Sequence, residues 1–274
     1  MSVATNLLAA ANAGLSAARR RSTIPGGVVF AYHDVLPTGA APFEYAVSID
    51  RLRQQLDLIE RFGLTVIPMA EMSRRMIDGG DLTGTVSIVF DDALIGVYQL
   101  ALPELHRRGW RSTLLPVLGE MDRLPWWWPG SRRTMSSAEF VDAASSDLVD
   151  VAVHGMTHTC FPCLSPERLA DELSTARSML TAMVGHDVNE VAYPYGHHDS
   201  RVREAVRAAG FTTGYTFLNG RVMHEYDPLR LPRITMHDGL TAPLLAHQVS
   251  RRATDWAANQ QQSVHPHAAP KGER

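Results

Sequence analysis

The stretch VSIVFDDALIGVYQL, residues 86–100, decides the fold and also places two carboxylates side by side. Residues 86–90 are almost continuously apolar, which is typical of a strand that is covered on both faces. Asp91 and Asp92 follow at once, and a helical pattern begins after them. Helix capping would explain one aspartate. Two adjacent carboxylates repel each other and cost free energy to desolvate, so the pair justifies a search for a cation.

Strands and helices alternate on both sides of this stretch. We expect strands at 27–32, 65–67, 85–90, 112–117, 149–153, 190–193, 212–217 and 233–236, and helices at 48–62, 69–77, from about 94 to Gly109, from Ser165–Pro166 onward, near 200–209 and near 242–257. Ser48 is placed to cap the first helix and Gly63 to end it. Seven or eight alternations indicate a parallel sheet, either closed into a barrel or open and doubly wound.

Length and composition favour one α/β domain with a large core. The chain has 274 residues, 45% of them hydrophobic, and a formal net charge of -3. The mixed charge argues against a nucleic-acid partner, which would need a basic patch. No apolar stretch approaches the roughly 20 residues of a transmembrane segment.

The two ends of the chain differ from the middle. Residues 1–24 are expected to form an N-terminal helical extension, residues 25–258 the main folded domain, and residues 259–274 a disordered tail. The first segment does not resemble a secretory signal, because its arginines follow the apolar part. The two cysteines, Cys160 and Cys163, are too few for a disulfide scaffold. These features together favour a cytoplasmic location.

Polar residues that can bind metals recur where the expected strands end. In α/β barrels the chemistry lies at the carboxyl ends of the strands. The residues found there are His33 and Asp34, Asp91 and Asp92, His154, Pro194 and Tyr195, and His237 and Asp238. A single histidine of this kind is usually a hydrogen-bonded loop residue, but the repetition favours a functional site.

The segment HGMTH, residues 154–158, is the sharpest local pattern. Two histidines four residues apart can converge on one ion, and neutral imidazole suits zinc and similar divalent metals. Gly155 replaces the glutamate of the zinc-protease helix motif, so that reading is excluded. The aspartate pair is the obvious source of a third ligand. One carboxylate can bind the metal while the other takes a proton from water.

Three segments carry a family resemblance. VFDDA (89–93), HGMTH with the following CLS, and AYPYG (192–196) resemble, in order and spacing, three motifs of the polysaccharide deacetylases, the NodB-homology carbohydrate esterases. The resemblance implies a single-domain α/β fold, a distorted (β/α)7 barrel. It also implies a hydrolase that removes an N-acyl group, normally acetyl, from an amino sugar with one bound divalent metal.

The resemblance assigns roles residue by residue. It implies Asp91 as the general base, Asp92, His154 and His158 as the metal ligands, and Pro194 and Tyr195 as the stretch whose Tyr backbone N–H holds the oxyanion. Zinc is the first choice of metal, with cobalt, nickel, manganese and iron as alternatives.

The general acid has two candidates. A branch of the family begins with a strand that ends in Tyr-His-Asp and carries a late LPRI, and this chain resembles that branch through VVFAYHDV (28–35) and LPRI (231–234). The similarity favours His33 over His237.

The chain departs from the family pattern in three places. Ala93 stands where glycine normally follows the aspartate pair. Ala192 stands where an arginine normally braces the base, and Arg233 is either its replacement or part of an exposed salt bridge. Cys160 and Cys163 lie beside His158 and could join a second metal site, form a redox bridge, or pack as small hydrophobes.

Trp126, Trp127 and Trp128 in LPWWWPG could stack on a sugar, touch a membrane surface or a protein, or pin the loop to the barrel. The expected partner is an N-acylated amino sugar or glycoconjugate, such as a glycolipid precursor or nucleotide sugar. Two other readings stay open, namely a metal amidohydrolase for a small non-sugar amide and a non-catalytic carbohydrate-binding relative. The sequence does not give the oligomeric state.

Overall fold

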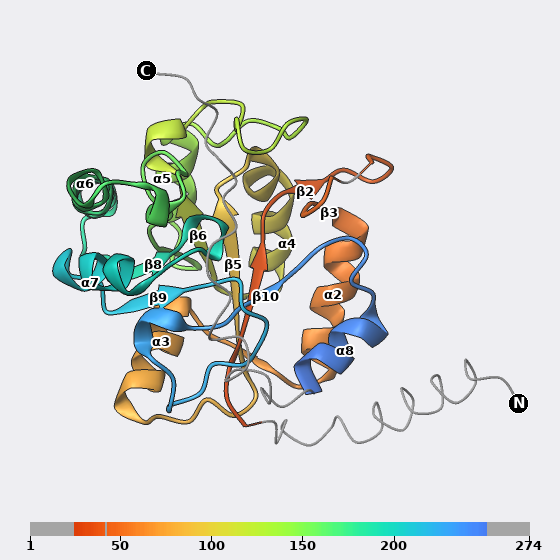
Figure 1. Ribbon diagram of the computed structural model, residues 1–274. Coiled ribbons are helices and arrows are strands. Elements are labelled where there is room, and N and C mark those ends of the chain that lie inside the picture. The colour runs from red at the N-terminus through yellow and green to blue at the C-terminus, as the bar shows by residue number, and fades with distance from the viewer. Residues whose placement is uncertain (1–24, 42, 251–274) are drawn as a thin grey trace, which may run out of the picture.

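Parallel strands form the centre of the molecule, and helices surround them (Figure 1). The computed structural model describes residues 25–41 and 43–250. The expected N-terminal extension at 1–24, the tail at 259–274 and the end of the last helix beyond residue 250 lie outside the described residues.

The strands close into a ring through two isolated bridges. The main sheet has the order β10-β1-β5-β6-β7, and β4 pairs with the start of β5, while β8 pairs with β9. Single parallel bridges, Val153 with Val191 and Tyr215 with Leu231, join that pair to the two edges of the sheet. The fold is therefore a distorted (β/α)7 barrel. The strands are β1 (Val28–Tyr32), β4 (Thr65–Val66), β5 (Thr85–Asp92), β6 (Ser112–Pro116), β7 (Val149–Val151), β8 (Glu190–Ala192), β9 (Thr213–Tyr215) and β10 (Ile234–Thr235).

The helices cover the outside of this ring (Figure 1). They are α2 (Ile49–Arg61), α3 (Met69–Asp78), a π-helix (Val97–Ala101) that runs into α4 (Leu102–Arg107), α5 (Ser137–Ala144), α6 (Pro166–Val184), α7 (Ser200–Ala208) and α8 (Ala242–Ser250). Two short strands, β2 (Val35–Leu36) and β3 (Val47–Ser48), pair with each other in the connection between β1 and α2. No helix within residues 25–41 and 43–250 combines the length and the apolar character that crossing a membrane requires.

Most expected elements are confirmed, with two instructive differences. Ser48 caps α2, because its hydroxyl accepts a hydrogen bond from the Arg51 N–H at 3.2 Å. Helix α5 is not among the expected elements, although Ser136 and Glu139 form a capping box that marks its start. Strand β5 runs two residues further than expected. Asp91 and Asp92 therefore belong to the barrel wall, where they pair with β6, and they do not cap a helix.

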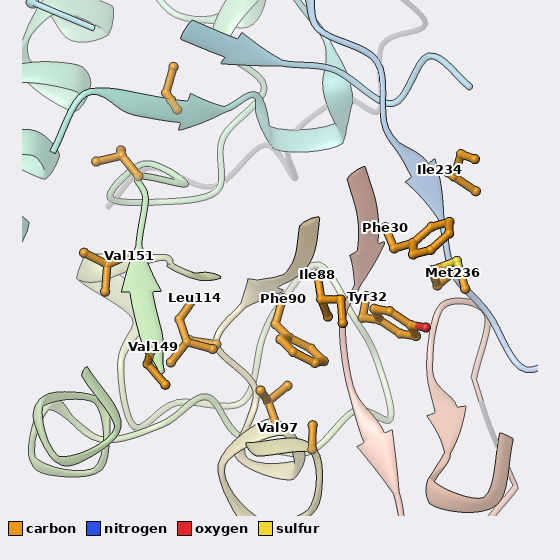
Figure 2. Close-up of a cluster of buried hydrophobic side chains, with 14 of the residues drawn as sticks. Phe30, Tyr32, Ile88, Phe90, Val97, Leu114, Val149, Val151, Ile234 and Met236 are labelled. Atoms are coloured by element: carbon orange, nitrogen blue, oxygen red, sulfur yellow. The ribbon is translucent and has the colours of Figure 1, made fainter. Parts of the chain in front are cut away.

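The pleat of the strands divides the core into an outer and an inner layer. Large side chains such as Phe30, Tyr32 and Phe90 pack outward against the helices, in the cluster that Figure 2 shows. The alternating positions carry smaller side chains, including Val29, Ala31, Val89, Ala152 and Ala192, which form a second cluster. Because side chains alternate along a strand, the inner series continues from Val89 to Asp91 and from Ala31 to His33. The barrel wall thus aims polar groups at one end of its own interior.

We expect Leu56→Ala to destabilise the protein by about 2–5 kcal/mol, because it would leave a cavity under α2. Leu56 is fully buried in the outer core layer. Chemical denaturation measures the change, and Gln54→Ala, an exposed position on the same helix, serves as the control. An equal effect of both substitutions would contradict this account of the core.

Candidate active site

Five side chains meet at the carboxyl end of the barrel, as the sequence predicts. Asp91 and Asp92 end β5, His33 follows β1, and His154 and His158 follow β7. All five are almost completely buried, with exposed fractions of 0 to 4%. Five polar groups kept from water at one point require partners, and their geometry shows what those partners are.

Asp92, His154 and His158 form a candidate metal site. Their ligand atoms all lie within 4.8 Å of one another, and no other set of three potential ligands in the described part of the chain does so. Asp92 Oδ1 is 3.4 Å from His158 Nε2 and 3.7 Å from His154 Nε2. This oxygen is buried and accepts no hydrogen bond from the described residues. One carboxylate and two imidazoles around an orphaned oxygen fit a divalent cation such as zinc.

The electrostatics of these ligands also fit a cation. Burial, reinforced by the charge of Asp91, raises the pKa of Asp92 to about 8. Burial lowers the pKa of His154 and, together with the other two histidines, that of His158, so both rings are neutral. The Nδ1 atom of His154 is 2.9 Å from the Ala192 carbonyl oxygen, which directs Nε2 toward Asp92. Neither histidine therefore supplies a positive charge that would balance an ionised Asp92.

Asp91 has a different partner. Its Oδ1 accepts a hydrogen bond of 2.7 Å from Arg233 Nη1, and both side chains are fully buried. Arg233 is fixed in turn, because its Nε donates to the Thr216 carbonyl at 3.0 Å and its guanidinium lies 4.7 Å from the centre of the Phe217 ring. Burial opposes ionisation of Asp91, but Arg233 and the nearby histidines bring its pKa below the ordinary value.

This arrangement resolves one alternative from the sequence. Arg233 is not part of an exposed salt bridge, since none of its side chain is exposed. In the family pattern an arginine at the position of Ala192 braces the base. Here Ala192, on the inner face of β8, has no such group, and Arg233 bonds to Asp91 from another strand.

His33 and His237, the two candidates for the general acid, lie in different surroundings. His33 Nε2 is 3.9 Å from Asp91 Oδ2, and burial lowers the pKa of this ring to about 4. The carbonyl of His237 accepts a hydrogen bond from Gln55 on α2, and its ring lies near Gly239. The structure thus brings His33, and not His237, to Asp91.

Several residues of the site adopt left-handed backbone conformations. Asp92 has φ 65°, His158 φ 57° and Tyr195 φ 59°, and Ala93 has φ 48°. Such angles are uncommon for residues other than glycine, and where they cluster they often mark a functional site. Tyr195 lies in the short helix Pro194–Gly196, and its ring contacts His158 edge-on at 4.6 Å between ring centres. The angle at Ala93 explains why a glycine suits that position.

The tryptophan loop covers the candidate metal site. Trp128 Nε1 donates to Asp92 Oδ2 at 3.0 Å, and the Trp127 ring stacks on His158 with 4.3 Å between ring centres. Trp126 is 43% exposed and contacts Trp127 edge-on. Two of the three indoles therefore pin the loop to the site, and the third faces outward.

Other functional positions were missed by the sequence analysis. Glu172 on α6 accepts hydrogen bonds from the backbone N–H groups of Met156 and Thr157 at 2.7 and 2.8 Å, which holds the HGMTH loop. A signal existed, because Glu172 interrupts the buried stripe of α6. A pocket of about 620 Å³ opens above the site, and its walls include Phe43, Glu44 and Tyr45 from a segment without a recognisable motif.

The two cysteines are free thiols outside the metal-ligand group. Cys160 is buried with its Sγ 3.6 Å from His197 Nδ1, and Cys163 is exposed. Burial, with the neighbouring Cys163, raises the pKa of Cys160 to about 12, so it packs here as a neutral thiol.

Known proteins share this fold. The fold matches PplD, a deacetylase of Streptococcus pyogenes solved in complex with acetate, with a TM-score of 0.73 and 18% identity over 84% of this chain and all of that one. It also matches IcaB from Ammonifex degensii, with a TM-score of 0.72 and 24% identity over 85% of this chain and all of that one.

Sequence comparison identifies a family. YxkH of Bacillus subtilis (strain 168), which carries a polysaccharide deacetylase name, is 20% identical over 156 residues. The match covers 57% of this chain and 53% of YxkH, so it spans about half the length of this curated relative. Residues 79–214, which hold Asp91, Asp92, His154 and His158, match the family model named polysaccharide deacetylase. With the barrel and the motifs in place, the chain belongs to the polysaccharide deacetylase family.

Proposed function

We propose that this protein is a metal-dependent N-deacetylase that acts on an amino sugar or a glycoconjugate containing one. The observation that carries the proposal is the division of labour between two adjacent carboxylates. Asp92 lies with two neutral histidines, whereas Asp91 is paired with Arg233. A site with one carboxylate for a cation and one for a proton is what hydrolysis of an amide by water requires.

The residues of the chain would share the work as follows. Asp92, His154 and His158 would hold the cation, which supplies Lewis-acid polarisation of the acyl carbonyl and makes bound water more acidic. Asp91 Oδ2 accepts no hydrogen bond from the described residues and faces His33 and His154, so it is free to take the proton of the attacking water. The Tyr195 backbone N–H would stabilise the negative charge that develops on the carbonyl oxygen.

His33 would return a proton to the departing amine. Its low pKa keeps the ring neutral near pH 7, so it must first acquire the proton that it gives. Asp91 is the group that gains a proton in the first step, and its Oδ2 is 3.9 Å from His33 Nε2. The pair could therefore pass one proton from water to the leaving nitrogen.

Exchanging one aspartate at a time should separate base from ligand. We expect Asp91→Asn to keep about one metal per chain and to lose about 10²- to 10⁴-fold in acetate release, because a general base is missing. Asp92→Asn should lose the metal as well as the activity. Metal analysis and acetate release from N-acetylglucosamine substrates measure both, and equal metal loss in the two variants would contradict the division of roles.

Metal affinity should depend on pH through Asp92. The raised pKa of about 8 means that the metal-free carboxyl is protonated at neutral pH and must release this proton on binding. The apparent affinity should therefore rise about tenfold per pH unit from pH 6 to 8 and level off above. Chelator competition measures it, and an affinity that does not change from pH 6 to 8 would refute this assignment.

Removing Arg233 should move the acidic limb of the activity profile. The guanidinium favours the charged form of Asp91, so Arg233→Met should raise the pKa of the base and shift the acidic limb of kcat/KM upward by about one pH unit or more. Arg233→Lys should shift it less. Arg177→Met is the control, since Arg177 bonds to Val188 and Asn189 away from the site. An unshifted limb in Arg233→Met would show that Arg233 does not set the pKa of the base.

A further inference from the structure

The pocket above the candidate metal site has a size suited to small ligands. Its volume of about 620 Å³ lies in the range of pockets that bury a small molecule. His33 and His158 face it from the barrel, and Trp127 lines it while stacked on His158. A sugar that reaches the site must therefore enter a walled pocket.

Two loops meet across one side of this pocket. The Trp128 ring contacts Tyr45 edge-on at 5.0 Å between ring centres and Phe43 at 5.4 Å. Trp128 is fixed from below by its hydrogen bond to Asp92. The segment 43–45 and the tryptophan loop thus form an aromatic wall on this side of the pocket, and the wall stands in the way of a polymer chain that would pass across it.

The walls also select by charge. Among the described residues that line the pocket, Glu44 is the one acidic side chain, and none is an arginine or a lysine. Away from the candidate metal site, a phosphate or diphosphate group in the pocket would find no guanidinium or ammonium partner among these lining residues, and it would meet the exposed carboxylate of Glu44. Aromatic faces, in contrast, suit the apolar faces of an uncharged sugar ring.

We propose that the pocket takes the terminal residue of a short, uncharged N-acetylated amino sugar, and excludes both the interior of polymers and sugars that carry phosphate. The inference rests on the proposed function for the reaction, and it adds the class of substrate. The aromatic wall of Phe43, Tyr45 and Trp128 would limit the length of the sugar chain that binds. Glu44 would disfavour substrates with negative charge.

A panel of substrates tests the length limit. Acetate release is compared for N-acetylglucosamine, its β-1,4-linked dimer, tetramer and hexamer, and the polymer, with the deacetylated position located by mass spectrometry. We expect kcat/KM to peak at one to three rings and the deacetylated residue to be a chain end. In Phe43→Ala the hexamer should gain at least fivefold relative to the dimer, while Leu124→Ala, an exposed position outside the pocket, should leave that ratio unchanged. Interior deacetylation of the hexamer or polymer by the wild type would overturn the proposal.

Binding to the Asp91→Asn variant separates this inference from the proposed function. Quenching of tryptophan fluorescence reports sugar in the pocket without any reaction. If short sugars bind to the variant but the wild type never releases acetate from them, the proposed deacetylase function is refuted and the assignment of the pocket to short sugars is retained. Failure of the short sugars to bind, or tighter binding of the hexamer, would overturn the pocket assignment.

Reversing the charge at Glu44 tests whether the pocket excludes sugars that carry phosphate. N-acetylglucosamine 6-phosphate and its uridine diphosphate derivative should bind the Asp91→Asn variant at least tenfold more weakly than N-acetylglucosamine. Adding Glu44→Lys to the Asp91→Asn variant should reduce the ratio of the two affinities about threefold or more. Asp78→Lys, which makes the same change of charge on the outer helix α3, should leave this ratio unchanged. Phosphorylated sugars that bind as well as the neutral one would overturn the charge rule.

Discussion

Two adjacent buried carboxylates have to be neutralised, and the rest of the site depends on how this is done. Asp91 and Asp92 end the central strand β5 with at most 1% of their surface exposed. Left alone they would repel each other across a medium of low dielectric constant. The chain supplies one buried guanidinium, Arg233, which bonds to Asp91. It supplies two neutral histidines for Asp92, so these ligands bring no positive charge of their own and suit a bound cation.

The partner of each carboxylate decides what that carboxylate can do. Asp91 is held ionised by Arg233 through one oxygen and keeps the other without a hydrogen bond, which suits a proton acceptor. Asp92 has a pKa raised to about 8 and an orphaned oxygen between two imidazoles, which suits a ligand whose proton a cation displaces. Breaking a buried pair typically costs about 3–5 kcal/mol, so Arg233 supports the fold as well as the base.

The sequence predicts the centre of the site better than its walls. The apolar run before Asp91, the spacing of His154 and His158, and the strand end at His33 each follow from periodicity or residue chemistry, and the structure brings these groups together. The wall at Phe43 and Tyr45 has no such signal, because loop contacts with Trp128 depend on tertiary packing and not on local pattern. Helix α5 is not among the expected elements although its capping box is present in the sequence, because the tryptophan-rich segment before it is typical of a loop.

The choice between His33 and His237 depends on the path of the chain after each strand, because residue type and register do not separate the two. β1 and β10 are paired with Phe30 opposite Ile234 and Ala31 opposite Thr235, so the two histidines follow at equivalent ends of neighbouring strands. The inward series of β1 carries His33 toward Asp91, whereas the chain after β10 turns away at Gly239 to reach α8. The same reasoning explains the arginine. A barrel interior is shared by all its strands, so the guanidinium of Arg233, just before β10, can bond to an aspartate on β5 when β8 offers only Ala192. The family motif indicates which strand usually supplies the arginine, but the pairing requires only that a guanidinium lies beside Asp91, whichever strand it comes from.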